Sequence, residues 1–217
     1  MIATRNQLIA AISLTVFLVT LTANSGTTAP EFKISSVRDK VGSLTIGPKA
    51  QAALRAAFPG FVPFEAKDFI HDAQTLFKNK SNESMSAEVG HFTSKEVPDL
   101  IVMGHYGKNQ VIAAVIPSGT GFKVVTIDVA DYIDPSTATF SPTPENANTN
   151  PSSAEQEGRN EQPGLGQYLS RGEKCHGLDT FQVETFYVNA DRYYYDPADG
   201  KFKLMDESVA RGCHNLR

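Results

Sequence analysis

The residues of this chain best suited to chemistry are two cysteines, each followed by a histidine, in Cys175-His176 and Cys213-His214. Two thiols and two imidazoles are a common zinc ligand set, but zinc sites usually space paired ligands two to five residues apart. Adjacent side chains of a strand also point to opposite faces. In an oxidising compartment an isolated cysteine pair is most simply a disulfide, worth about 4 kcal/mol for a loop of about 39 residues. A Cys175–Cys213 disulfide is therefore favoured, with a zinc site as the alternative.

Other polar side chains offer weaker signals of chemistry. Asp68, His71 and Asp72 form a small cluster that could supply acid–base groups or metal ligands, although solvated loop residues are the favoured account. His105 follows an apolar run, where it could contact a ligand or respond to pH, with a structural histidine favoured. The chain has no nucleophile elbow, His-Glu-x-x-His helix, phosphate loop or dinucleotide fingerprint. We therefore assign no catalytic residue and expect no cofactor.

A run of three tyrosines is the most prominent candidate for an interface. Alternation along a strand turns Tyr194 away from Tyr193 and Tyr195, so at least one ring should face outward. Aromatic residues with polar tips are enriched at protein interfaces. Cross-strand packing against Phe202 is the favoured alternative, because aromatic pairs commonly stabilise sheets. These tyrosines, together with His105, are the possible interface residues.

The N-terminal residues have the pattern of an export signal. Arg5 precedes the apolar run Leu8–Leu21, and Ala23-Asn24-Ser25 offers the small-x-small pattern of a cleavage site. The run is shorter than the ~20 apolar residues of a membrane-spanning helix, although an uncleaved anchor is the alternative. We therefore predict a signal peptide over 1–25 and a periplasmic or secreted mature chain, with no membrane contact after cleavage.

The amino-acid composition argues against some classes of binding partner. The chain has a formal net charge of −4 and 41% hydrophobic residues, and its charged residues are scattered. A mildly acidic chain without a stripe of Lys and Arg argues against nucleic acid or an anionic membrane as partner. The ~190 residues after the signal suit one domain, or one domain and a tail.

The elements that must position these residues are mostly strands. Residues 26–40 are expected to be a flexible lead-in, and a helix is expected from Pro48 to Pro59-Gly60. Residues 61–77 should form an ordered loop or short helix. Short apolar runs separated by Gly, Asn and Pro turns then predict a four-stranded antiparallel meander within 41–133. Its strands are expected at Met85–Phe92, Leu100–Tyr106, Gln110–Ile116 and Phe122–Val129.

The C-terminal third divides into two parts. Residues 134–166 are rich in Pro, Ser, Thr, Asn and Glu and predict a disordered linker or insertion. Residues 167–217 predict an aromatic hairpin unit closed by the disulfide, with strands at Asp179–Val188, Tyr193–Tyr195 and Lys201–Met205. The fold class is α+β and β-rich, with antiparallel meander sheets and one short N-terminal helix. One domain is expected, and two subdomains are the alternative.

The stretch Gly90 to Val102, which reads GHFTSKEVPDLIV, resembles the FG-GAP (VCBS-type) repeat, the blade unit of integrin-alpha-like propellers. That family runs strand, calcium loop, strand, with carboxylates and amides at alternate loop positions. The positions matching its ligands hold His91, Thr93, Lys95 and Asp99, of which only Asp99 is a carboxylate. The resemblance therefore implies a strand–loop–strand unit with a degenerate loop and no calcium. A full propeller needs several blades, and the chain has no second copy.

These patterns favour an exported, non-enzymatic binding module with an unknown protein or glycan partner. One alternative is an enzyme, hydrolase-like, whose residues are scattered. An apolar pocket lined by His71, Asp72 or His105 would support that alternative. A metal-stabilised structural module, built on the degenerate loop or the Cys-His pairs, is the third possibility.

Overall fold

The structure is a computed structural model, and it describes residues 31–35, 40–78, 80, 83–140, 162–186 and 188–214. The predicted signal peptide and residues 141–161 of the predicted linker lie outside the described residues. Within the part described, no helix has the length and apolar character needed to cross a membrane.

The described chain is built mostly from antiparallel strands. Its helices are α1 (Pro48–Ala57), the 3-10 turn η1 (Ala66–Asp68), α2 (His71–Phe77) and α4 (Glu207–His214). Its strands are β1 (Phe32–Ser35), β2 (Ser43–Ile46), β3 (Val62–Pro63), β4 (Ala87–Gly90), β5 (Asp99–Tyr106), β6 (Asn109–Ser118), β7 (Gly121–Asp131), β8 (Thr139–Phe140), β9 (Gln162–Pro163), β10 (Gln167–Arg171), β11 (Phe181–Thr185), β12 (Asn189–Asp196) and β13 (Lys201–Leu204).

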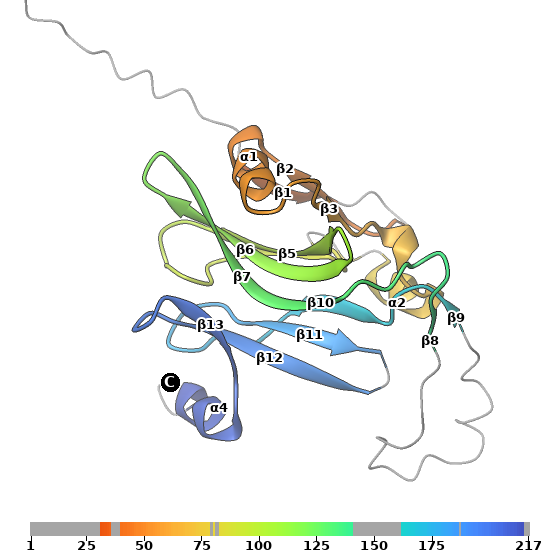
Figure 1. Cartoon of the computed structure of the whole chain (residues 1–217). Coiled ribbons are helices and arrows are strands. Elements are labelled where there is room, and N and C mark those ends of the chain that lie inside the picture. The colour runs from red at the N-terminus through yellow and green to blue at the C-terminus, as the bar shows by residue number, and fades with distance from the viewer. Residues whose placement is uncertain are drawn as a thin grey trace, which may run out of the picture.

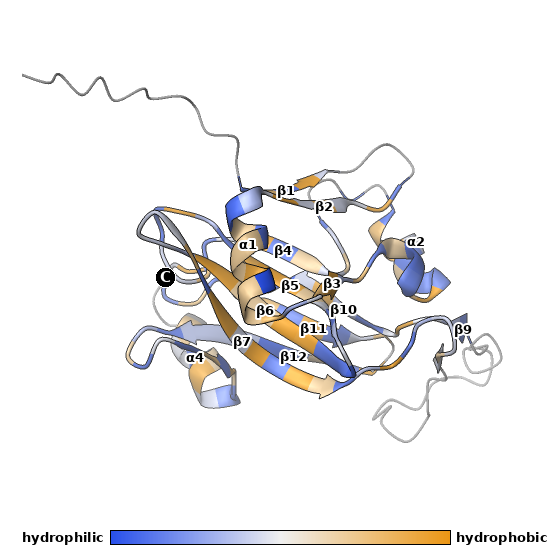
Figure 2. Ribbon diagram, turned by 45° about the horizontal axis from the view of Figure 1, so that its top comes forward, coloured by the Kyte–Doolittle hydropathy of each residue, from blue (hydrophilic) through white to orange (hydrophobic). Residues whose placement is uncertain are grey.

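The first large sheet contains the predicted meander. β4, β5, β6 and β7 pair in chain order, each antiparallel to the next, and β3 pairs with the far end of β5. β5 and β6 are buried on both faces over most of their length, which explains why both read as unbroken apolar runs (Figure 2). Gly104 is needed where β3 crosses β5, because a Cβ there would lie 2.3 Å from the Val62 carbonyl oxygen.

The second large sheet, β10–β11–β12–β13, is antiparallel throughout and stacks on the first (Figure 1). The two sheets share one buried cluster, to which the first contributes Ile101 and Met103 and the second Leu169 and Phe181. Two sheets that bury their inner faces against each other form a sandwich. This packing fixes the positions of the strand ends and the connecting loops of one sheet relative to those of the other.

A third layer covers the outer face of the first sheet. α1 and the β1–β2 hairpin lie there (Figure 1). Their side chains Leu54, Phe32 and Ile34 are buried in one cluster with Leu100 and other apolar side chains. The expected flexible lead-in over 26–40 is therefore wrong for residues 32–35. Phe32 and Ile34 alternate with exposed residues, but a four-residue strand gives too short a pattern to detect without its partner β2.

The β-rich α+β class is confirmed, but three α-helices are present among the described residues where one was expected. α4 was missed although Asp206 accepts hydrogen bonds from the backbone N–H groups of Ser208 and Val209, and an aspartate at this place is an N-cap signal visible in the sequence.

The predicted linker over 134–166 extends too far toward the C-terminus. Leu165 is buried, and its carbonyl accepts the Ile70 N–H at 3.1 Å, so the chain is already packed before residue 166.

Candidate functional site

Three connecting segments meet at one end of the sandwich. They are the loop between β4 and β5 (residues 91–98), the segment between β10 and β11 (172–180), and the turn between β12 and β13 (197–200). The first two are tied together by reciprocal hydrogen bonds. The His91 N–H donates to the Asp179 carboxylate at 2.8 Å, and the Asp179 N–H donates to the His91 carbonyl at 2.9 Å. Gly90 permits this contact, because a Cβ there would lie 2.8 Å from an Asp179 carboxylate oxygen.

The loop 91–98 is held from within by its buried aspartate. Asp99 is fully buried and accepts hydrogen bonds from the Thr93 N–H at 2.7 Å and the Thr93 hydroxyl at 3.1 Å. Burial raises the pKa of the Asp99 carboxyl, and the Thr93 bonds offset part of that shift. Lys95 is exposed at the tip of the loop.

These residues do not suit a calcium ion. Both oxygens of the one carboxylate already accept hydrogen bonds from Thr93, and an ammonium occupies the Lys95 position. Calcium needs six to eight oxygen ligands. The strand–loop–strand arrangement of 87–106 matches the layout that the FG-GAP resemblance implies, while membership of that family stays a prediction.

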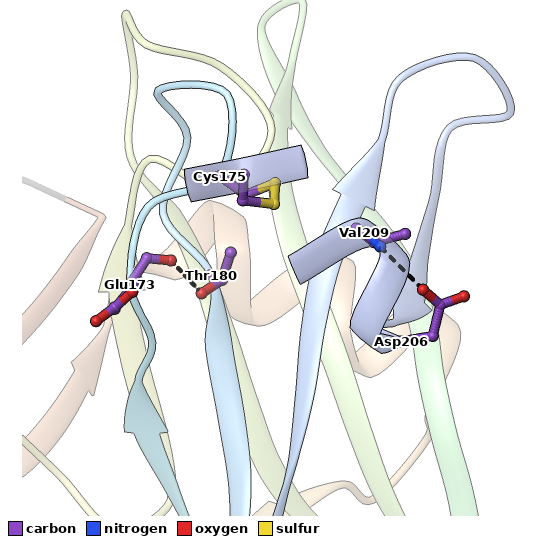
Figure 3. Close-up of a disulfide and its surroundings, with 6 residues drawn as sticks. Glu173, Cys175, Thr180, Asp206 and Val209 are labelled. Carbon is purple, nitrogen blue, oxygen red and sulfur yellow. Dashed lines mark hydrogen bonds between the residues drawn. A yellow bond between two sulfur atoms is a disulfide. The ribbon is translucent and has the colours of Figure 1, made fainter. Parts of the chain in front are cut away.

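The predicted disulfide is present. Cys175 and Cys213 are bonded with Cα atoms 4.6 Å apart, which joins the segment before β11 to α4 (Figure 3). Nearby, the Thr180 hydroxyl donates to the Glu173 carbonyl and supports the same segment (Figure 3). The His176 ring lies beside the bridge, with a ring nitrogen and the two sulfurs within 4.8 Å of one another. The sulfurs are bonded to each other rather than free as zinc ligands.

His176 occupies an unfavourable backbone conformation at the tip of a tight turn. Cys175 and Leu178 exchange backbone hydrogen bonds of 2.9 and 3.0 Å around His176 (φ 52°) and Gly177 (φ 81°). Two-residue hairpin turns with two positive φ angles favour Asn-Gly. His176 is the one non-glycine residue with positive φ in the described chain. Such outliers gather at binding sites, where function offsets their cost.

We expect His176→Asn to raise the free energy of unfolding by about 0.5–1 kcal/mol, because asparagine adopts the left-handed region more readily. Gly177→Ala should instead lower it by about 1 kcal/mol or more, since its φ of 81° is one that alanine rarely adopts. Urea unfolding of the three proteins measures both effects. A His176→Asn variant that is less stable than the wild type would show that the turn is not strained.

The tyrosine run divides between the core and the surface as alternation predicts. Tyr193 stacks on Phe181 with ring centroids 5.1 Å apart, and Tyr195 packs across the strands on Phe202 at 5.3 Å. Tyr194 and Tyr195 both line a surface hollow of about 440 Å³, together with residues of loop 91–98 and of the 175–178 turn. The cross-strand alternative is therefore correct for Tyr195, and Tyr194, which alternation places on the other face of β12, is the favoured partner contact of the two.

A second hollow, of about 860 Å³, adjoins the first. Lys95, His176 and Asp179 line both hollows, and we call the two adjoining hollows together the end cleft. Arg171 and Lys174 add positive charge to the larger hollow, and Cys213 forms part of its wall. A cleft of this size with mixed charges and a tyrosine ring can hold an extended polar ligand.

Some charged side chains of the end cleft form ion pairs with one another, and others do not. Asp179 lies 3.5 Å from Lys174 Nζ and 4.0 Å from an Arg171 nitrogen, and Arg171 also lies 3.3 Å from the Glu88 carboxylate. Lys95 takes part in none of the ion pairs of the described residues. Its ammonium is therefore the cation most available to a ligand.

Glu88 lies behind Arg171 at the junction of the two sheets. Its side chain is 1% exposed, and its Oε1 atom is buried without a hydrogen-bond partner in the described structure. Burial raises the pKa of Glu88 to about 7, although the Arg171 charge opposes the shift. The residue is shielded from the cleft and acts on it only through Arg171.

The other predicted polar residues lie elsewhere. His105, near the opposite end of β5, stacks on Tyr132 at 4.5 Å and lines a hollow of about 220 Å³ whose walls include Asp68 and Asp134. Asp72 pairs with Gln162 through hydrogen bonds of 2.6 and 3.1 Å. The structure thus separates His105 from the tyrosine run. The hollow beside His105 has a mixed lining, with apolar residues such as Phe64 and charged residues such as Asp68, so it fits only in part the apolar pocket that the enzyme alternative predicts.

Four residues of this region were not predicted from the sequence: Glu88, Arg171, Lys174 and Asp179. The contact between Arg171 and Glu88 spans 83 residues, so no local spacing could reveal it. A charged residue at a buried position of an apolar strand was the one available signal, at Glu88.

Comparison of the chain with protein-family models, with curated proteins and with solved structures gives no match.

Proposed function

We propose that this chain is an exported, non-enzymatic binding module that holds a protein or glycan partner in the end cleft. The proposal rests on one observation, which is that three separate features of the sequence lie around the same cleft. Loop 91–98, the disulfide-anchored turn at His176, and Tyr194 were each singled out separately along the sequence, and all three line the same cleft.

The chemistry of the end cleft supports binding rather than catalysis. Its walls offer an ammonium at Lys95 that forms no ion pair within the described part of the chain, two tyrosine rings, and a strained turn that presents His176. These groups recognise charge and shape, and tyrosine is enriched where proteins bind partners. No hydrogen bond between the His176 ring and a carboxylate or hydroxyl, of the kind that activates a nucleophile, is present among the described side chains.

Tyr194→Ala tests the proposal. Removing an aromatic ring from a binding cleft costs about 1–2 kcal/mol, so we expect partner binding to weaken about five- to thirty-fold. Residues 26–217 of the wild type and the variant would be immobilised, and retention compared on a glycan array and on a panel of envelope and secreted proteins.

Tyr106→Ala is the matched control. Tyr106 is also a half-buried tyrosine, packed on Phe58, but it ends β5 about 23 Å along the strand from loop 91–98. It should leave binding unchanged. Equal binding by wild type, Tyr194→Ala and Tyr106→Ala would remove the end cleft as the binding site, provided that all three unfold cooperatively.

A further inference from the structure

The end cleft carries both cations and carboxylates. Lys95, Arg171 and Lys174 line the larger hollow beside Glu173 and Asp179. Cations attract an acidic ligand, whereas carboxylates accept hydrogen bonds and repel other carboxylates. A ligand that fits this mixture must combine separated negative charges with hydrogen-bond donors.

Two further features bear on the ligand. The two hollows adjoin at Lys95, His176 and Asp179 and together reach from Arg171 to Tyr194, so they suit a chain rather than a single small ion. Tyr194 offers an apolar ring with a polar tip at one end of that path.

An acidic peptide satisfies only part of these conditions. Its carboxylates would be attracted to Lys95 but would meet Glu96 and Asp179 in the smaller hollow, where only its backbone N–H groups could donate hydrogen bonds. Each residue of a uronate polysaccharide carries one carboxylate and several hydroxyl groups. The hydroxyls can donate to Glu96, an exposed carboxylate of the smaller hollow, while the carboxylates reach the cations, and a sugar face can lie on the Tyr194 ring.

We propose that the ligand of the end cleft is an acidic polysaccharide of uronate residues, bound through Lys95 and Arg171 with Tyr194 against a sugar face. This inference rests on the proposed binding function and names its ligand class. Lys95 carries the largest share, because, of the three cations that line the end cleft, it is the one that forms no ion pair among the described residues.

Calorimetric titration of residues 26–217 with hexagalacturonate at low salt tests the proposal. The expected result is saturable binding that weakens with added salt, and that falls ten-fold or more in Lys95→Ala. Lys108→Ala is the matched control, because Lys108 is an exposed lysine in the turn at the opposite end of β5. It should bind like the wild type.

Two other probes define the ligand class. Neutral cellohexaose should show no binding, and hexaglutamate should bind at least ten-fold more weakly than hexagalacturonate. Any of three results would overturn the inference: hexaglutamate binds as tightly as the uronate, hexagalacturonate does not bind, or Lys95→Ala binds hexagalacturonate like the wild type. If Tyr194→Ala loses binding to a partner but the wild type binds no uronate, this inference alone is overturned. If partner binding is unchanged in Tyr194→Ala, the proposed function itself is overturned.

Discussion

Replacing both Cys175 and Cys213 with serine is expected to lower the free energy of unfolding by about 4 kcal/mol. The bridge spans a sequence separation of 38 residues and is the covalent tie between α4 and the segment before β11. Without it, the unfolded chain gains conformational freedom and α4 loses its anchor. Urea unfolding of the oxidised wild type and the double variant, without reductant, measures the difference.

Reductant provides the control for this prediction. It should shift the wild type toward the stability of the double variant and leave the double variant unchanged. Zinc and chelator should change neither oxidised protein, because the sulfurs are bonded to each other. Equal unfolding midpoints for wild type and double variant would show that the bridge contributes nothing. A midpoint of the oxidised wild type that rises with zinc would favour a metal site.

Glu88 is expected to make the protein less stable as pH rises from about 5 to 7. Its pKa is raised from 4.5 to about 7 in the folded state, so within that window the folded protein holds a proton that the unfolded chain has released. The free energy of unfolding therefore falls with rising pH, by about 3 kcal/mol over the whole window, and levels off above pH 7.

Glu88→Gln removes this titration while keeping the shape of the side chain. The stability of the variant minus that of the wild type should increase by about 3 kcal/mol between pH 4.5 and pH 8, whatever constant cost the amide itself brings. Glu96→Gln, which replaces a carboxylate at an exposed loop position, is the matched control for the substitution itself. A constant difference for Glu88→Gln would show that the buried carboxylate is stabilised in its charged form.

Much of the fold followed from local signals. β5, β6 and β7 were predictable because they are long, apolar and separated by tight turns, and α1 because Pro48 starts a regular stripe. β10 was missed because its two buried residues, Tyr168 and Leu169, are adjacent, which breaks the alternation of a half-buried strand.

The candidate site was predictable only in pieces. Tyr194, Lys95 and the cysteines could each be singled out by type and position, but their convergence depends on the stacking of the two sheets. Arg171 and Asp179 had no local signal, because their roles arise from contacts with Glu88 and His91, more than 80 residues away in sequence. Sites assembled from loop ends of different sheets cannot be inferred from spacing.

Amide hydrogen exchange, measured with and without a saturating ligand of the wild-type protein, tests the end cleft most directly. The account predicts slower exchange on binding in residues 91–98, in 172–180 and in the turn 197–200, with no change around His105 and Tyr132 at the other end of β5. Protection confined to the His105 end, or to the outer layer of α1 and the β1–β2 hairpin, would contradict it.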